Sequence, residues 1–231
     1  MILSHKYKFI FIRTLKTAGT SIEIALSKFC GKNDIVPPIT PEDEETRRKL
    51  GYTGPQNYFV PFRKYSKMDW AKFFYKRKRL VFRNHNSARF IKEHIDEDIW
   101  NTYFKFCFER NPWDKVVSGY FWMFRNTREE DRPSLPEFIN TYEDAYTIPG
   151  VDLYTINGRI VVNKVFKFEE LNESLEEITK TAGLPEVPIL PKAKAYSRKD
   201  KRNYRELLTE SNKDIIAKVY AREIAYHGYT W

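Results

Sequence analysis

Residues 9–21 have the sequence FIFIRTLKTAGTS, and this stretch decides the expected fold. Its first four residues are apolar and have the length of a buried strand. The polar and small residues after them have the chemistry of a turn, and Ile22, Leu26 and Phe29 then recur at helical spacing. A strand, a loop and a helix are therefore predicted in direct succession, which is the repeating unit of α/β proteins.

The same alternation continues along the chain. Further strands are predicted at residues 80–82, at residues 103–108, which are apolar except for Lys105, and at residues 164–168. Residues 31–60 are expected to form a long loop with short elements. Helical spacing and capping residues predict helices that begin near Ser87, Pro112, Asn172 and Leu207. Because strands that alternate with helices favour a parallel sheet, we expect an α/β fold. It would be a single domain, residues 1–231, with a P-loop-like central parallel β-sheet flanked by helices.

The loop between the first strand and the first helix is a candidate anion site. Loops at the carboxyl edge of a parallel sheet bind ligands, and small residues let backbone N–H groups surround an anion at the helix N-terminus. The candidate residues are Lys16, Thr17, Ala18, Gly19, Thr20 and Ser21. The lysine precedes the glycine, so the loop is not a Walker A motif, which needs GxxxxGK[ST]. The alternative is a helix N-terminus that binds nothing.

A second candidate motif is residues 109–120, ERNPWDKVVSGY. Arg110 follows the predicted strand 103–108, and Ser118 lies about two turns into the next helix. A guanidinium at that sheet edge can give charge-assisted hydrogen bonds to phosphate. The alternative is that Arg110 only pairs with Asp114 or Glu109.

Residues 84–88, NHNSA, supply a candidate general base. His85 follows the predicted strand 80–82, and a histidine pKa near 6.5 suits removal of a hydroxyl proton near neutral pH. The alternatives are that His85 has a structural role and that His94, two turns further along the helix, is the base.

Together these motifs resemble the PAPS-dependent sulfotransferases, which use 3′-phosphoadenosine-5′-phosphosulfate (PAPS) as donor. Residues 16–21, KTAGTS, are similar to the 5′-phosphosulfate loop of the carbohydrate (heparan 2-O-sulfotransferase-like) branch, whose usual form is PKTAGTS. Arg110 and Ser118 resemble the family's 3′-phosphate motif. Arg198 lies in a late basic loop, which either closes over the 3′-phosphate, as such a loop does in relatives, or is only solvated. The resemblance covers roughly residues 8–231, although Arg13-Thr14-Leu15 departs from the common His-Ile-Pro lead-in.

The resemblance implies a transfer of the sulfuryl group from PAPS to a hydroxyl-bearing acceptor, without a metal. His85 would take the hydroxyl proton, and Lys16 would stabilise the departing phosphate oxygen. The net charge of +9 and the pI of about 9.3 favour an anionic partner, which points to an anionic sugar or polysaccharide as acceptor. An inactive PAPS-binding relative is a further alternative.

Two other function classes stay open at this point. A P-loop-type kinase for a nucleotide or small molecule fits the loop, although the Walker pattern is broken. A single-stranded nucleic-acid-binding protein fits residues 63–83, where nine Lys or Arg and one Asp are interleaved with aromatic residues. No nucleic-acid-binding motif accompanies this stretch, so a nucleic-acid partner is not expected.

The cysteine content and the apolar patterning limit which metal sites and which cellular locations are expected. The two cysteines, Cys30 and Cys107, form no CxxC pair, so neither a disulfide framework nor a zinc site is predicted. No run of about 18 apolar residues predicts a membrane span, and the first eight residues are too polar for a signal peptide. A cytoplasmic protein is therefore expected. The sequence does not determine the oligomeric state.

Overall fold

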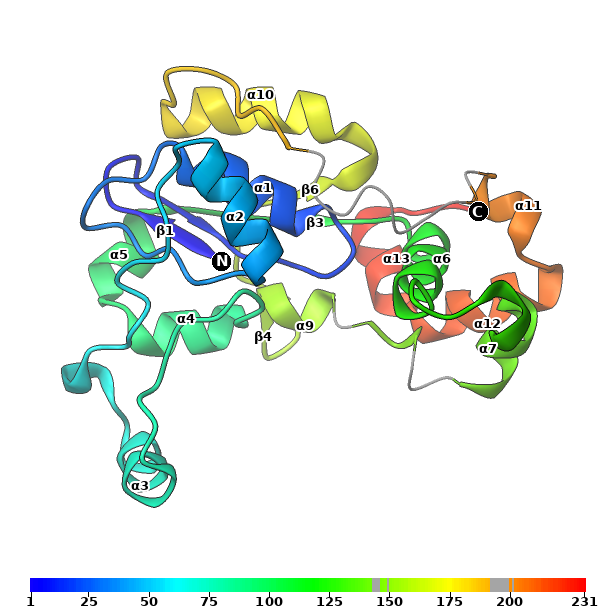
Figure 1. Cartoon of the computed structure of the whole chain (residues 1–231), viewed down its shortest axis with the longest axis horizontal. Coiled ribbons are helices and arrows are strands. Elements are labelled where there is room, and N and C mark those ends of the chain that lie inside the picture. Colours follow the sequence, from blue (N-terminus) through cyan, green and yellow to red (C-terminus); the bar gives the residue numbers. More distant parts are fainter. Residues whose placement is uncertain (143–145, 149, 192–199, 201) are drawn as a thin grey trace.

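The structure is a computed structural model of the whole chain that describes residues 1–142, 146–148, 150–191, 200 and 202–231. Arg198 and the late basic loop around it lie outside the described residues. The predicted α/β fold is confirmed: helices flank a central, mostly parallel sheet (Figure 1).

Four strands form the central sheet in the order β1-β2-β3-β6. They are β1 (Ile2–Ser4), β2 (Phe9–Phe11), β3 (Phe104–Glu109) and β6 (Lys164–Lys167). Strands β2, β3 and β6 are parallel, as predicted, and β1 is an antiparallel edge strand that the sequence patterns did not indicate. The carboxyl ends of three parallel strands therefore meet at one edge, where ligands bind in folds of this kind.

Alternate residues of the strands face two different helical layers. Phe9 and Phe11 point to the layer of α1 (Gly19–Ser27) and α10 (Leu171–Ala182), which lies above the sheet in Figure 1. Ile10 and Ile12 point to the opposite layer, which contains α4 (Ala88–His94), α5 (Glu97–Thr102) and α9 (Val151–Tyr154). Because strand side chains alternate between faces, residues 9–12 are buried on both sides, which explains their continuous apolar run.

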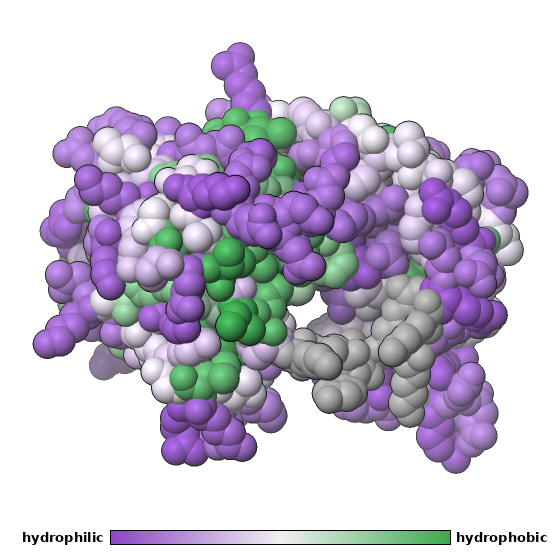
Figure 2. Space-filling view, turned by 90° about the horizontal axis from the view of Figure 1, so that it is seen from above, coloured by the Kyte–Doolittle hydropathy of each residue, from purple (hydrophilic) through white to green (hydrophobic). Residues whose placement is uncertain are grey.

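A third apolar cluster lies beyond the carboxyl edge of the sheet. Trp113, Phe138 and Ile216 belong to it and come from three different helices. The helices of this part are α6 (Pro112–Met123), α7 (Leu135–Thr141), α11 (Tyr204–Leu207), α12 (Glu210–Val219) and α13 (Ala221–His227). They form the right-hand part of Figure 1, so the carboxyl edge of the sheet lies between two helical groups. Figure 2 shows a mostly hydrophilic face with a recess near its middle.

Two predicted elements differ in the structure. Residues 80–82 do not join the central sheet: Val81 forms an isolated antiparallel bridge with Phe59, so this segment closes the base of an excursion of the chain. That excursion contains η1 (Phe62–Lys64) and α3 (Lys67–Lys76). The helix expected from Asn172 begins one residue earlier, after Glu170, and ends at Gly183, which has a φ of 66°.

The remaining elements are short. Within the segment expected to be mainly loop, the helix α2 (Pro41–Lys49) is capped by the Thr40 side chain. The others are η2 (Glu129–Asp131), β4 (Thr155–Ile156), β5 (Arg159–Ile160) and η3 (Phe168–Glu170). Cys107 is buried and Cys30 is partly buried, and both are free thiols.

Candidate active site

The loop between β2 and α1 has an unusual backbone. Lys16 and Ala18 have φ values of 64° and 55°, in the left-handed region that residues other than glycine seldom adopt. Such left-handed residues next to ordinary ones turn successive N–H groups toward one concave side. The first hydrogen bond of α1 runs from Ile22 N to Ala18 O, so the amides of Gly19 to Ser21 precede it and have no acceptor within the helix. The loop therefore has the backbone of an anion cradle.

Side chains below the loop fix this shape. The Thr14 hydroxyl donates to the Phe108 carbonyl and lies 2.9 Å from the hydroxyl of Thr17, which is fully buried. The Thr17 side chain thus faces the interior, and only its backbone can serve the cradle. Arg13 donates to Glu23 and, at 2.6 Å, to the Thr20 hydroxyl.

Gly19 is required where the Arg13 side chain crosses the start of α1. A Cβ at this position would lie 2.6 Å from Arg13 Cγ, which is closer than Cβ atoms come to other atoms in proteins. The sequence could not indicate this contact, because it depends on the path of the Arg13 side chain. The glycine of the motif thus has a packing role as well as a place in the cradle.

Lys16 lies between the cradle and the end of α6. Its ammonium is 5.3 Å from the centre of the Trp122 ring, which is itself exposed and carries the Arg125 guanidinium at 4.5 Å. Trp122 was not a predicted site residue. The sequence signal that could have indicated Trp122 is its position on the helix of the second motif, eleven residues after Asn111.

Arg110 joins the two sequence motifs. One guanidinium nitrogen donates to the Lys16 carbonyl at 2.9 Å, and two others donate to Asp114 Oδ2 at 2.8 and 2.6 Å. The guanidinium also lies over the Phe168 ring at 4.3 Å, at the end of β6. The structure therefore contains the alternative pairing with Asp114, and in addition it places Arg110 directly against the cradle.

Ser118 lies two turns along α6 and is half-buried. Its hydroxyl makes no hydrogen bond to another residue that the structure describes. Arg110 follows β3 and contacts the cradle, and Ser118 lies on the next helix, α6. Arg198 lies outside the described residues.

His85 contacts the backbone that leads into the cradle. Its Nδ1 is 3.2 Å from the Arg13 carbonyl. A carbonyl oxygen only accepts hydrogen bonds, so Nδ1 carries the proton and Nε2 keeps its lone pair. The outer side of the residue is exposed. Removal of water from the inner side of the ring, together with the Arg13 charge, lowers the His85 pKa to about 4. The imidazole is therefore neutral near pH 7, as a base must be.

Comparison with known proteins places the chain in a family. The model of a sulfotransferase family matches residues 1–230. The chain belongs to this sulfotransferase family. An uncharacterized protein of Archaeoglobus fulgidus is 33% identical to the chain over 101 residues, which are 43% of the present chain and 83% of that protein. No solved structure matches the chain.

The other candidate base, His94, makes its contacts away from the cradle. Its Nδ1 lies 2.7 Å from the Phe90 carbonyl, its Nε2 lies 3.3 Å from Asp69 on α3, and its ring is buried. Both nitrogens thus contact acceptors at the far end of α4. The structure brings His85, and not His94, to the cradle.

A buried charged cluster supports the end of β3 behind Arg110. The Lys115 ammonium donates to Glu109 at 2.8 Å, and both residues are essentially inaccessible to solvent. Tyr154 donates to the other Glu109 oxygen at 3.1 Å and contacts His227 at 2.8 Å. Burial raises the pKa of Tyr154 far above its usual range. This cluster fixes the strand end from which Arg110 projects.

Two further findings concern the described ranges only. Within them, no group of three or more His, Cys, Asp or Glu side chains is arranged to hold a metal ion. No helix there has the length and apolar character needed to cross a bilayer.

Proposed function

We propose that the protein transfers the sulfuryl group of PAPS to a hydroxyl of its acceptor. The contact between Arg110 and the Lys16 carbonyl carries this proposal, because it joins two candidate anion sites into one continuous surface. PAPS has a phosphosulfate at the 5′ position and a phosphate at the 3′ position, so it requires two such sites. Membership of the sulfotransferase family supports the same reaction class.

The residues of the site suit this reaction in distinct ways. The amides of Gly19 to Ser21 and the Lys16 ammonium would hold the 5′ anion, and Arg110 with Ser118 would hold the 3′-phosphate. His85 Nε2 is the group that would accept the proton of the acceptor hydroxyl. PAPS when bound would supply the sulfuryl group, and catalysis would rest on positioning and electrostatic stabilisation.

We propose an anionic carbohydrate as the acceptor class. A cavity of about 750 Å³ beyond the end of α6 includes four arginines and two carboxylates in its lining. One of these arginines, Arg125, stacks on Trp122, whose ring also lies near Lys16. Aromatic rings beside cations suit a sugar that carries a carboxylate or sulfate. The charged lining residues are Arg125, Arg128, Glu129, Arg132, Asp200 and Arg202.

The donor assignment predicts stabilisation by 3′-phosphoadenosine-5′-phosphate. At about 100 times its Kd a ligand adds roughly 2.7 kcal/mol, which corresponds to a melting-temperature rise of about 5–10 °C for a chain of this size. The measurement is a thermal-shift titration, with adenosine-5′-phosphosulfate, ATP with magnesium, and a short single-stranded oligonucleotide as comparisons. Equal stabilisation by adenosine-5′-phosphosulfate would remove the 3′-phosphate site. A larger shift with ATP and magnesium would instead support a kinase.

Arg110→Ala is expected to weaken binding of the same nucleotide by about 1.5–3 kcal/mol, the size of a hydrogen bond to a charged group. Arg110→Lys should recover only part of this, because an ammonium lacks the planar fork. Calorimetric titration measures both, and Arg222→Ala, which removes an exposed arginine paired with Asp152, is the control. Unchanged affinity in Arg110→Ala would refute its assignment to the 3′-phosphate.

A further inference from the structure

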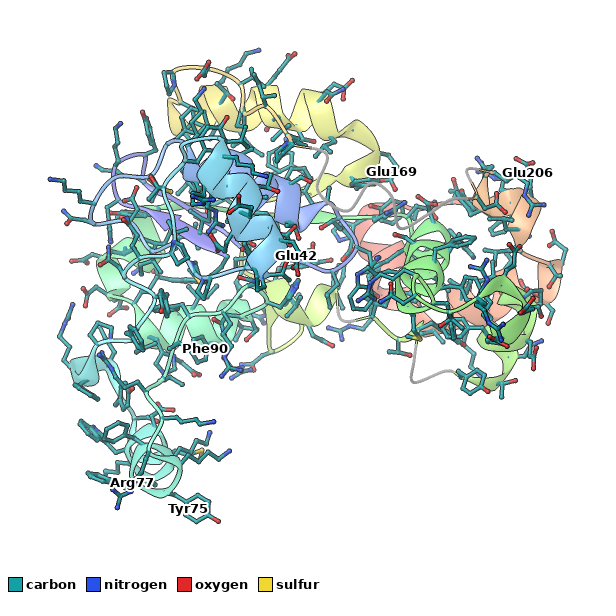
Figure 3. The ribbon with its side chains drawn as sticks, viewed as in Figure 1. Glu42, Tyr75, Arg77, Phe90, Glu169 and Glu206 are labelled. Atoms are coloured by element: carbon teal, nitrogen blue, oxygen red, sulfur yellow. The ribbon has the colours of Figure 1, made fainter. Side chains whose placement is uncertain are left out.

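Residues 59–82 form an arm that projects from the body of the protein. Backbone hydrogen bonds close its base, from Val60 N to Leu80 O at 3.0 Å and from Phe82 N to Tyr58 O at 2.7 Å. The arm contains η1 and α3, and no residue of α3 is buried. Figure 1 shows α3 well away from the sheet, and Figure 3 shows Tyr75 and Arg77 at its outer end. The sulfuryl-transfer site does not use this arm.

The arm concentrates apolar side chains at the surface. Among the described residues, six of the fourteen exposed large hydrophobic side chains lie between positions 59 and 75. They are Phe59, Phe62, Met68, Trp70, Phe74 and Tyr75. Met68, Phe74 and Tyr75 are the most exposed of them, at 66%, 70% and 87%. Exposed apolar side chains gathered in this number on one short segment are unfavourable in water and indicate an interaction site.

The arm also concentrates positive charge. Residues 63–83 contain nine Lys or Arg and a single acid, Asp69. Asp69 faces inward, since its carboxylate accepts from Ser66 and contacts His94 on the body. Within the part of the chain that the structure describes, Lys72 and Lys76 of α3 have no acidic partner. The outer face of the arm is therefore both apolar and cationic.

Two kinds of occupant fit this surface poorly. A second copy in a symmetric contact would bring one cationic arm against another, where like charges repel. Single-stranded nucleic acid needs open ring faces on which bases stack. Phe62 and Phe74, however, both stack on Trp70, with centroids 5.4 and 5.8 Å away, and the Arg79 guanidinium lies 4.8 Å from the Phe62 ring centre. The faces of Phe62, Trp70 and Phe74 are therefore partly covered by one another and by Arg79.

We propose that this arm binds the surface of an anionic lipid bilayer and lies in its interface without crossing it. Exposed aromatic and aliphatic side chains beside lysines are the composition that settles at the boundary between headgroups and acyl chains. Met68, Phe74 and Tyr75 enter that boundary, while Lys72 and Lys76 meet the anionic headgroups. The proposal stands apart from the sulfuryl-transfer reaction and needs no residue of that site.

Vesicle sedimentation with the full chain tests the proposal. The chain is expected to sediment with phosphatidylcholine vesicles that contain about 30% phosphatidylserine and to stay in solution with phosphatidylcholine alone. Replacing two lysines by Lys72→Glu and Lys76→Glu should lower the partition coefficient at least about 30-fold, since each basic residue near the surface contributes roughly fivefold. The pair Lys180→Glu and Lys218→Glu makes the same charge change on exposed parts of α10 and α12 and should keep binding near that of the parent.

A second pair of variants tests the apolar contribution. Met68→Ala with Phe74→Ala should lower the partition coefficient about tenfold or more, whereas Val187→Ala with Ile189→Ala, at exposed positions elsewhere, should not. Melting temperatures should match the parent, because α3 buries no side chain. Equal binding to neutral and anionic vesicles, or equal losses in the control pairs, would overturn the proposal. It would also be overturned by a dimer that the Met68 and Phe74 pair dissolves, or by an oligonucleotide that binds more tightly than the vesicles.

Discussion

His85→Ala is expected to lower kcat by about 10²–10⁴-fold, the usual contribution of a positioned acid–base group. Its Nδ1–H donates to the Arg13 carbonyl, which leaves Nε2 as the only ring nitrogen able to accept a proton. Nucleotide affinity should change little, because the anion cradle is built from other residues. Turnover is measured with labelled PAPS and acceptors drawn from a panel of anionic and neutral sugars.

The pH dependence tests the same assignment. Partial burial and the nearby Arg13 charge lower the pKa of His85 to about 4, below the value near 6.5 expected from sequence. A depressed pKa means that the active, neutral form persists as pH falls through 6 and is lost only near pH 4. The acid limb of kcat/KM, which reports the free enzyme, should therefore lie well below pH 6.5.

His5→Ala is the matched control for His85→Ala. His5 is also partly exposed, and its Nδ1 contacts the Tyr103 hydroxyl at 2.9 Å near the opposite edge of the sheet. The substitution His5→Ala should leave kcat unchanged. If His85→Ala folds, binds nucleotide and turns over at the normal rate, His85 is not the base. If it loses thermal stability and activity together, its role is to brace the segment that precedes α4.

Lys16→Met is expected to lower kcat by about 10²–10³-fold, as does the loss of one preorganised charge-stabilising group in other enzymes. Methionine keeps the length of the side chain and removes its charge. In the proposed reaction the ammonium would matter most when the leaving phosphate oxygen becomes anionic, so its interaction would strengthen in the transition state. The loss should therefore be larger in kcat than in nucleotide affinity.

Steady-state kinetics and calorimetry separate these effects. Lys28→Met, at the other end of α1, removes a half-exposed lysine paired with Glu186 and should leave both quantities unchanged. A raised KM for the donor with a normal kcat would instead show that Lys16 binds the ground state and transition state equally.

Much of the fold followed from local patterns. The strands at residues 9–11, 104–109 and 164–167 lie within the segments predicted as strands. The helix after Ser87 and the helix that begins at Pro112 start at residues whose chemistry favours a helix start. Residues 80–82 misled the prediction, because an apolar run of three predicts an extended segment without specifying its partner. Their partners are residues 58–60 at the base of the arm. The edge strand β1 was too short for a periodic signal.

The sequence by itself determined the α/β fold, the order of the two candidate anion-binding motifs and the position of a histidine between them. These features depend on residue types and local spacing, which a short stretch of sequence contains by itself. Only the tertiary structure decided that Arg110 reaches the Lys16 carbonyl, that His85 contacts Arg13, and that Trp122 lies beside Lys16. These pairs are separated by 72 to 106 residues, and their contacts exist only once the strands have paired. The same packing sets the pKa of His85, because a pKa responds to burial and neighbouring charge and not to the sequence around the residue.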